Sequence, residues 1–288
     1  MTLSFAWKSV REAANLPVFE PGWVWLVGAG PGDAGLLTLH ALSALQQADI
    51  VVFDALVDEA VLKLARPGAV IEYAGKRGGK PSPKQRNISL RLIEWAKQGK
   101  RVLRLKGGDP FLFGRGGEEA LALVAASVPF RVVPGVTSGI GGLAYAGIPA
   151  THRDINHAVT FVTGHMAGGN VPSTINWRAL AEGSPVIVIY MGLKHLARIA
   201  TELVSAGRSL HEPVAIISGA TTQNQLVLET ELGRADADVR ASGIKAPALI
   251  VVGEVVRLRA GLDWLSALSG RKLIADPLGA SENERERA

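Results

Sequence analysis

The chain has 288 residues, 48% of them hydrophobic, so it can bury a sizeable core in one or two domains. It contains no cysteine, which excludes disulfides, thiolate metal sites and cysteine nucleophiles and is compatible with a reducing cytoplasm. The formal net charge is +5, and the six histidines show no metal-ligand spacing, so we expect no metal site.

The two ends of the chain are predicted to be peripheral segments. Residues 1–20 lack the apolar stretch of a signal peptide, and no apolar run approaches the ~20 residues that cross a bilayer. We therefore expect a soluble cytoplasmic protein with no membrane partner, an N-terminal extension at 1–20 and a C-terminal tail at 263–288.

The first half of the chain alternates short β-branched runs with helical patterns. Strands are predicted at 23–27, 50–54, 70–73, 101–105 and 130–133. Helices are predicted between them at 36–48, 59–65, 84–98 and 117–126. This alternation favours a largely parallel sheet with helices on both faces, in an N-terminal α/β domain at 21–135.

The second half begins with a Gly/Ala-rich segment after residues 134–137. Strands are predicted at 158–163, 185–190, 214–218, 225–229 and 248–252. The strands at 214–218 and 225–229 leave little room for a crossover helix, so they are expected to pair antiparallel. We predict a C-terminal α/β domain with a mixed sheet at 136–262.

The segment VWLVGAGPGD at 24–33 reads as a strand that runs into a glycine-rich turn. Gly28 and Gly30 fit a dinucleotide-binding fingerprint, but its third glycine is replaced by Asp33. A carboxylate there would repel a pyrophosphate at a helix N-terminus, and Pro31 removes a backbone donor. The segment therefore favours a tight strand-to-helix turn over a nicotinamide or flavin site.

Residues 76–106 contain eleven Lys or Arg and a single acid, Glu94. Such a basic stretch is typical of a surface that meets nucleic acid, an anionic membrane or a small polyanion, and also of a solvated helix face. The stretch lacks aromatic interleaving, since Trp95 is its single aromatic residue, and the sequence has no recognisable nucleic-acid module. A polyanion-binding protein is therefore the competing class of function, and nucleic acid is not the expected partner.

Two long segments carry a resemblance to a known family. They are VGAGPGDAGLLTLHALSALQQADIVVFDALV at 27–57 and RLKGGDPFLFGRGGEE at 104–119. Shorter pieces follow in order: VVPGVTSGIGGLAYAGIPATHR at 132–153, VTGH at 162–165, YMG at 190–192 and APALIVVGEVV at 246–256. Together, over about residues 22–258, they resemble the uroporphyrinogen-III C-methyltransferases, a branch of the tetrapyrrole methylase superfamily of class III S-adenosylmethionine (SAM)-dependent methyltransferases.

The resemblance implies a homodimer of two-domain α/β chains with an active-site cleft between the domains. It also implies methylation of C2 and C7 of uroporphyrinogen III by SAM, which leaves S-adenosylhomocysteine. The product, precorrin-2, forms through precorrin-1 and leads to sirohaem, cobalamin or haem d1. Residues 1–20 leave no room for a fused dehydrogenase-ferrochelatase domain, so a monofunctional enzyme is expected. Another tetrapyrrole, precorrin or diphthamide methylase is the alternative, against which the second signature argues.

The cofactor site is carried over from the family. Asp109 is expected to attract the ammonium or sulfonium charge of SAM, or else to cap the turn in which it lies. Thr137 and Ser138 are expected to touch the cofactor, to begin the following helix, or both. The expected cofactor contacts are Pro31, Gly107, Gly108, Asp109, Leu112, Thr137, Ser138, Met191, Ala220 and Ala248.

The expected catalytic residues suit a polycarboxylate substrate. Arg115 and Arg153 are expected to bind its carboxylates through their guanidinium groups. Glu118 faces the substrate in the family, although it could also cap a helix or pair with Arg115. Asp54 matches the family's proton acceptor, or else caps a strand end, and Lys76 matches its proton donor. Methyl transfer of this kind depends on orientation and electrostatics and needs no metal.

Overall fold

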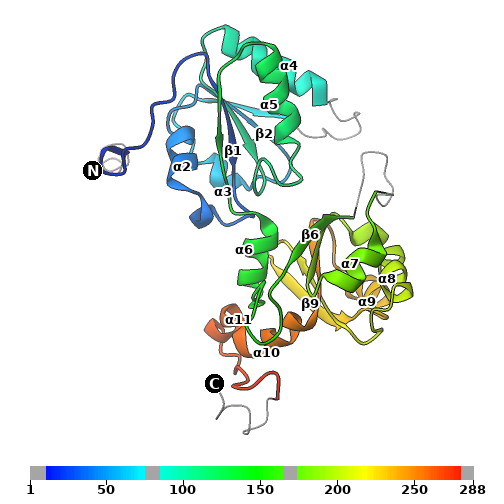
Figure 1. The fold of residues 1–288 in the computed structure, drawn as a ribbon. Helices are drawn as coiled ribbons and strands as arrows, with labels where there is room; N and C mark the ends of the chain where they lie inside the picture. The colour runs from blue at the N-terminus through cyan, green and yellow to red at the C-terminus, as the bar shows by residue number, and fades with distance from the viewer. Residues whose placement is uncertain (1–10, 75–84, 165–173, 280–288) are drawn as a thin grey trace. The chain divides into compact units, whose positions relative to one another are not determined.

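The computed structural model describes residues 11–74, 85–164 and 174–279. The chain divides into two compact units, Met1–Thr137 (unit 1) and Ser138–Ala288 (unit 2). Each unit has its own five-stranded sheet, which Figure 1 shows with helices packed against it. The predicted α/β class, with one parallel and one mixed sheet, is confirmed.

The sheet of unit 1 is parallel throughout, because every pair of neighbouring strands runs in the same direction. Its strand order is β3-β2-β4-β1-β5. The strands are β1 (Val24–Gly28), β2 (Ile50–Phe53), β3 (Val70–Tyr73), β4 (Val102–Lys106) and β5 (Phe130–Val133). Each lies within one or two residues of its predicted position, since buried β-branched runs bounded by turn residues mark such strands well.

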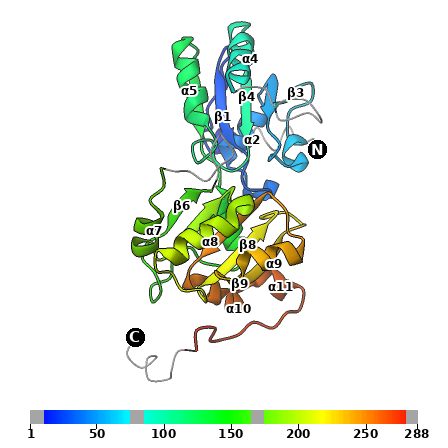
Figure 2. The ribbon, with the colours of Figure 1, turned by 90° about the vertical axis from the view of Figure 1, so that its right-hand side faces the viewer.

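Helices cover both faces of this sheet, and successive residues along its strands point alternately into two hydrophobic cores. Trp25 and Leu103 face a core with α2 (Leu39–Leu45) and α3 (Glu59–Leu62). Leu26 and Val102 face another core with α4 (Gln85–Lys97) and α5 (Gly116–Ala125). Figure 2 shows α4 and α5 next to each other beside β1 and β4. Both faces are therefore sealed, and the open parts of the sheet are its strand ends.

The helix predicted at 36–48 is shorter in the structure. A 3₁₀ helix, η1 (Ala34–Leu36), comes first, and α2 begins only at Leu39. The reason is Thr38, whose Oγ1 accepts a hydrogen bond from the Ala41 amide at 3.1 Å and caps the helix. The apolar periodicity continues on both sides of such a cap, so a prediction from periodicity alone makes the helix too long.

The sheet of unit 2 is mixed and has the order β6-β7-β10-β8-β9. Its strands are β6 (Thr160–Thr163), β7 (Ile187–Tyr190), β8 (Pro213–Ser218), β9 (Leu226–Glu231) and β10 (Ala248–Val252). β6 and β7 are parallel, whereas β10 pairs antiparallel with both β7 and β8. The predicted antiparallel pairing of β8 with β9 is confirmed.

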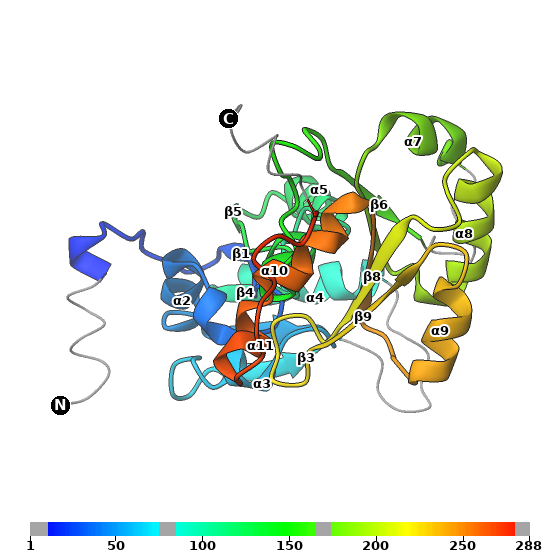
Figure 3. The ribbon, with the colours of Figure 1, turned by 90° about the horizontal axis from the view of Figure 1, so that it is seen from below.

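One face of this sheet is covered by α7 (Trp177–Gly183), α8 (Leu196–Ser205) and α9 (Ala235–Ser242), as Figure 3 shows from below. α6 (Ser138–Tyr145) packs on the other face, where a Cβ atom on Gly142 would lie 3.1 Å from Leu249. Two further 3₁₀ helices follow strands: η2 (Leu193–His195) after β7 and η3 (Glu254–Leu258) after β10.

The segment expected to be a tail from residue 263 begins as an anchored part of unit 2. It follows α10 (Arg259–Leu262) and contains α11 (Trp264–Leu268). Asp263 is buried and pairs with Arg259 at 2.5 Å and with Arg271 at 3.0 Å. The Trp264 Nε1 donates to the Ala144 carbonyl at 2.9 Å, which ties α11 to the end of α6. The composition of the segment did not reveal these contacts.

Candidate active site

The carboxyl ends of the parallel strands of unit 1 meet at one edge of the sheet. The loops that follow β1, β2, β4 and β5 therefore lie along this edge. Ligands of open parallel sheets bind in this place, beyond the carboxyl ends of the strands. These loops carry Pro31, Asp54, Asp109 and Thr137, so the structure brings these predicted site residues to one edge.

Three of these loops touch through glycine backbone. A Cβ atom on Gly28 would lie 2.5 Å from both the Gly108 carbonyl oxygen and the Gly135 Cα. A Cβ atom on Gly135 would lie 2.8 Å from the Gly28 Cα. Gly30 and Gly108 also exchange two backbone hydrogen bonds, of 3.2 and 2.7 Å. Only glycine permits this approach, so the loops after β1, β4 and β5 form one connected backbone surface, which we call the glycine junction.

The turn after β1 is stabilised by one of its own side chains. Asp33 is the N-cap of η1, and its Oδ1 accepts a hydrogen bond from the Gly35 amide at 2.7 Å. The carboxylate therefore stabilises the turn, and it occupies the helix N-terminus at which the pyrophosphate of a dinucleotide would bind. Pro31 lies half-buried in the same turn.

Asp109 connects two loops at the glycine junction. Its Oδ1 accepts from the Phe111 amide at 2.8 Å, and its Oδ2 accepts from the Gly135 amide at 3.0 Å. Of the two roles open for Asp109, the structure thus contains the turn-capping contact and adds a bond to the loop after β5. Gly107 lies beside it, where a Cβ atom would be 2.5 Å from the Cβ of Leu56.

The loop between β4 and α5 has strained backbone at two residues, one of which is the predicted substrate-binding arginine. Phe113 and Arg115 have positive φ angles of 54° and 59°. Non-glycine residues of this kind cost of order 1–3 kcal/mol and cluster at functional sites. The Arg115 Nε pairs with the Glu118 Oε2 at 2.7 Å, as one of the alternatives proposed, and 53% of the arginine side chain stays exposed. Leu112 is half-buried in this loop.

Asp54 follows β2 and is held from two sides. Its Oδ1 accepts from the Leu56 amide at 3.0 Å, and its Oδ2 lies 3.7 Å from an Arg104 terminal nitrogen. Arg104 and Lys106 both reach the fully buried Glu119, at 3.0 and 3.3 Å. Burial, and then the charge of Arg104, lower the pKa of Lys106, although Glu119 acts in the opposite direction.

The buried residues Arg104, Lys106 and Glu119 were not predicted as site residues. A signal was present, because β4 has two cations at alternate positions between apolar residues. Alternate residues share one face of a strand, and cations are almost never fully buried without a partner. The second glutamate of GGEE supplies that partner.

In unit 2, several predicted cofactor residues meet at another sheet edge. Tyr190 pairs with Leu249 and Ser218 pairs with Ala248, so the residues after β7 and β8 lie beside the start of β10. Met191, Ala220 and Ala248 belong to this edge. α6 reaches it as well, because a Cβ atom on Gly142 would lie 2.9 Å from the Ala220 Cβ.

The start of α6 is fixed to β7 by Tyr190. The Tyr190 hydroxyl accepts a hydrogen bond from the Gly139 amide at 2.7 Å, next to Ser138, the first residue of the helix. Met191, the next residue, has a φ of 53° and is 50% exposed. A flexible apolar side chain in the left-handed region is uncommon, and Met191 is one of the residues that the resemblance predicts to contact the cofactor.

Arg153 lies in an exposed loop between α6 and β6. The loop is held by the buried Asn156, which accepts from the His152 amide at 2.9 Å and donates to the Ala150 and Ala158 carbonyls. Among the described residues, no hydrogen bond or ion pair ties Arg153 to another site residue. The sequence signal for Asn156, a lone amide in a loop, was too weak to single it out.

The remaining observations concern residues and features outside these edges. Lys76 lies outside the described residues. Within the described ranges no group of three or more His, Asp or Glu side chains could hold a metal ion. None of the helices described is long and apolar enough to span a bilayer.

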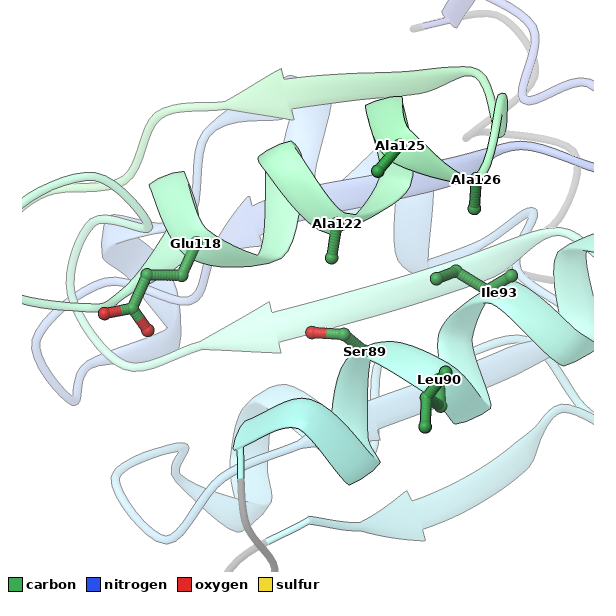
Figure 4. A pocket seen from close by; sticks show the side chains of 7 residues that line it. All are labelled: Ser89, Leu90, Ile93, Glu118, Ala122, Ala125 and Ala126. Atoms are coloured by element: carbon green, nitrogen blue, oxygen red, sulfur yellow. The ribbon is translucent and has the colours of Figure 1, made fainter.

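A shallow groove of about 500 Å³ runs between α4 and α5. Figure 4 shows Glu118 at one end of it and Ala126 at the other, with Leu90 and Ile93 contributed by α4. Its lining is mostly apolar, and Glu118 is the only predicted site residue in it. None of the predicted cofactor contacts lines this groove.

Comparison with known proteins identifies the class. Residues 24–236 match the family model described as Tetrapyrrole (Corrin/Porphyrin) Methylases. The chain belongs to this family, and the resemblance drawn from the two long signatures is confirmed. A uroporphyrinogen-III C-methyltransferase of Sinorhizobium sp. is 69% identical over 264 residues, which cover 92% of this chain and 94% of that protein.

Two other similarities are informative. The siroheme synthase of Zymomonas mobilis is 50% identical over 92% of this chain, but the match spans only 55% of that longer protein. Among solved structures, the uroporphyrin-III C-methyltransferase of Thermus thermophilus in complex with S-adenosylhomocysteine is 42% identical. It aligns with a TM-score of 0.70 and covers 82% of this chain and 99% of its own.

Proposed function

We propose that this protein is a SAM-dependent methyltransferase that methylates uroporphyrinogen III at C2 and C7, giving precorrin-2 through precorrin-1. The product would enter sirohaem, cobalamin or haem d1 synthesis. The observation that carries the proposal is the 69% identity, over nearly the whole length of both chains, to a uroporphyrinogen-III C-methyltransferase.

The residues fit SAM as the methyl donor. At the glycine junction the backbones of three loops pack directly against one another, which brings peptide groups to the sheet edge where ligands of parallel sheets bind. Asp109 stabilises the junction through two backbone amides. The cofactor contacts proposed in unit 2 are Ser138, Met191, Ala220 and Ala248. SAM supplies an electrophilic methyl group, and transfer of that group leaves S-adenosylhomocysteine.

The chain's own residues would orient the substrate and accept its proton. Arg115 and Arg153, both exposed, would bind carboxylates of the porphyrinogen by charge-assisted hydrogen bonds. A ring carbon then forms the new bond to the methyl group, and Asp54 accepts the proton that a pyrrole nitrogen loses. Glu118 would hold Arg115 in place, and Lys76 remains the proposed proton donor.

The test is direct. Purified protein with SAM and uroporphyrinogen III, kept reduced, should produce S-adenosylhomocysteine and a doubly methylated product that mass spectrometry detects. SAM alone, or SAM with nucleic acid, should give no turnover. Activity on a later precorrin or on a diphthamide precursor, with none on uroporphyrinogen III, would instead assign the chain to another branch of the family.

A homodimer forms part of the proposal, since the family resemblance implies it. A cytoplasmic location is proposed as well, and the lack of cysteine is compatible with a reducing compartment. Light scattering on the purified chain should give twice the mass of 30.3 kDa. A monomeric mass at assay concentration would refute the dimer without affecting the proposed reaction.

A further inference from the structure

A cluster of buried charges lies directly behind Asp54. Arg104 and Lys106 come from β4 and Glu119 from α5, and we call these three residues the buried charge cluster. Each is nearly inaccessible, with side-chain exposures of 4%, 4% and 0%. Asp54 is 27% exposed and is the member of this group that reaches the surface.

Glu119 holds the cluster together. Its carboxylate lies 3.0 Å from the Arg104 Nε and 3.3 Å from the Lys106 Nζ. A buried carboxylate between two cations is expensive to desolvate and is stable only with good geometry. The sum of the charges of Arg104, Lys106, Glu119 and Asp54 is zero, so the Asp54 carboxylate completes the balance.

The Arg104 guanidinium is fixed in several directions at once. Beyond Glu119, one terminal nitrogen donates to the Val52 and Leu105 carbonyls, at 3.3 and 3.1 Å. The other terminal nitrogen lies 3.7 Å from the Asp54 Oδ2. A planar group with five donors in a rigid fork can serve these partners together, whereas a lysine ammonium cannot.

Asp54 is thereby held on both oxygens. The Leu56 amide donates to Oδ1 at 3.0 Å, and the fixed guanidinium faces Oδ2. β2 and β4 are neighbours in the sheet, and Val52 is the register partner of Arg104, so the two charged side chains project from the same face. The orientation of Asp54 at the sheet edge thus depends on a residue that substrate would not touch.

We propose that Arg104 is a positioning residue for methyl transfer, which acts by holding the Asp54 carboxylate in the orientation in which it accepts the substrate proton. Glu119 fixes Arg104 for this role. The inference rests on the proposed function, because it takes Asp54 to be the proton acceptor.

Stability alone does not account for the cluster. Buried ionic triads are often no more stable than apolar side chains of similar volume, so such a cluster adds little that leucine and methionine would not. β4 is fully buried and otherwise apolar, and its two cations, Arg104 and Lys106, lie on the face of the sheet that carries Asp54. An ion pair with a purely structural role could lie anywhere in the core, whereas Arg104 of this cluster contacts the proposed proton acceptor, Asp54.

The first experiment replaces Arg104 with lysine, which keeps the charge beside Glu119 and loses the fork. We expect kcat to fall roughly 10- to 100-fold, because a misplaced catalytic group costs rate, while the affinity for S-adenosylhomocysteine stays within about twofold. Calorimetry gives the affinity, and thermal unfolding shows that the variant folds. A kcat equal to that of the wild type would overturn the proposal.

The second experiment separates positioning from a general structural effect. In an Asp54→Asn background, Arg104→Lys should cause no further loss of turnover, since the residue through which it acts is already disabled. If the fold-losses in kcat of the two single variants multiply in the double variant, Arg104 acts independently of Asp54, and the positioning role is refuted. Wild-type turnover in Asp54→Asn alone would refute it as well.

The third experiment guards against misfolding. The variant Arg104→Met/Lys106→Met/Glu119→Leu replaces the cluster by apolar side chains and leaves no unpaired charge, so it should fold. Its kcat should fall as in Arg104→Lys, and a folded triple variant with full turnover would overturn the inference. Arg208→Lys is the matched control, because Arg208 forms a largely buried pair with Glu212 in unit 2, and its kcat should not change.

The outcomes distinguish the inference from the function on which it rests. If the wild-type protein fails to methylate uroporphyrinogen III, the proposed function is wrong. If the wild type is active and the variants of the cluster retain its kcat, only the positioning role is wrong.

Discussion

The two sheets end in edges of different chemical character. The edge of unit 1 carries Asp54 and Arg115, with buried charges behind them, whereas the edge of unit 2 carries Met191, Ala220 and Ala248. In unit 1, side-chain ion pairs hold Asp54 and Arg115. In unit 2, the Tyr190 hydroxyl holds the start of α6, and Met191 and Thr221 have positive φ angles of 53° and 64°.

This difference indicates what each edge can do. Charged, oriented side chains suit a polyanionic substrate and a proton transfer, whereas small and apolar residues suit a flat, uncharged ring. Unit 2 also has buried charges, but they brace its fold. Arg259 pairs with Asp263 and donates to the Ala146 carbonyl at 3.0 Å, just after α6. A buried ion pair is therefore informative about function only when it ends at a site.

The largest effect should come from the glycine junction. Gly135→Ala would place a Cβ atom 2.8 Å from the Gly28 Cα, and backbone on both sides leaves no room for it. We expect the free energy of unfolding to fall by about 3 kcal/mol or more in urea titrations. Gly183→Ala, where a Cβ atom would meet nothing within 4 Å, is the matched control and should stay near the wild-type value. Equal stability of the two variants would contradict the close approach.

Arg115→Lys tests the charged edge of unit 1. The ammonium group cannot form the bidentate bond to a carboxylate, so kcat should fall on the order of 10²-fold, while the affinity for S-adenosylhomocysteine stays nearly intact. Arg178→Lys alters another exposed arginine-glutamate pair, on α7, and should leave kcat unchanged. Unchanged turnover of Arg115→Lys would remove Arg115 from the site.

Asp109→Ala tests how unit 1 holds its cofactor loop. Two backbone amides lose their acceptor, so we expect a stability loss of about 1–3 kcal/mol and weaker binding of S-adenosylhomocysteine by calorimetry. Asp109→Asn retains one oxygen acceptor and no charge. If the loop geometry matters most, Asn should recover part of the affinity; equal losses in Ala and Asn would assign the effect to the charge.

Tyr190→Phe is the corresponding test in unit 2. The variant removes the acceptor of the Gly139 amide and keeps the ring, so the first turn of α6 loses one hydrogen bond. We expect S-adenosylhomocysteine to bind about fivefold more weakly, which corresponds to ~1 kcal/mol for one such bond. Native affinity in this variant would mean that backbone strain alone shapes the edge.

The smallest effect concerns pH. Burial raises the pKa of Asp263, but hydrogen bonds from Ser266 and the charge of Arg259 outweigh it and hold the pKa below the ordinary value of 3.8. A depressed folded-state pKa stabilises the fold above the unfolded value and loses that contribution as pH falls through the folded one. Stability should therefore decline below about pH 4. Asp263→Asn should show a weaker decline in acid unfolding, and an unchanged profile would refute the role of Asp263.

Local patterns in the sequence were sufficient for the strands, whereas the predicted chemistry came from the resemblance of two long segments to a known family. The strand positions follow from buried β-branched runs, and the antiparallel β8–β9 pair follows from the short link between them. Arg115 and Asp109 stand in one of those family segments, and their roles in binding stay predictions from the resemblance. Such signals are local, because they depend on neighbours in the chain.

Contacts between distant residues were decided only by the tertiary structure. The partner of Arg104 is Glu119, fifteen residues away, and Arg104 also faces Asp54 from the neighbouring strand. The bond from the Gly135 amide to Asp109 and the bond from Trp264 to Ala144 likewise join separate segments, and the latter turns an expected tail into part of unit 2. The physical reason is that burial and charge pairing depend on which strands become neighbours, and parallel neighbours are chosen by the packing of the whole sheet.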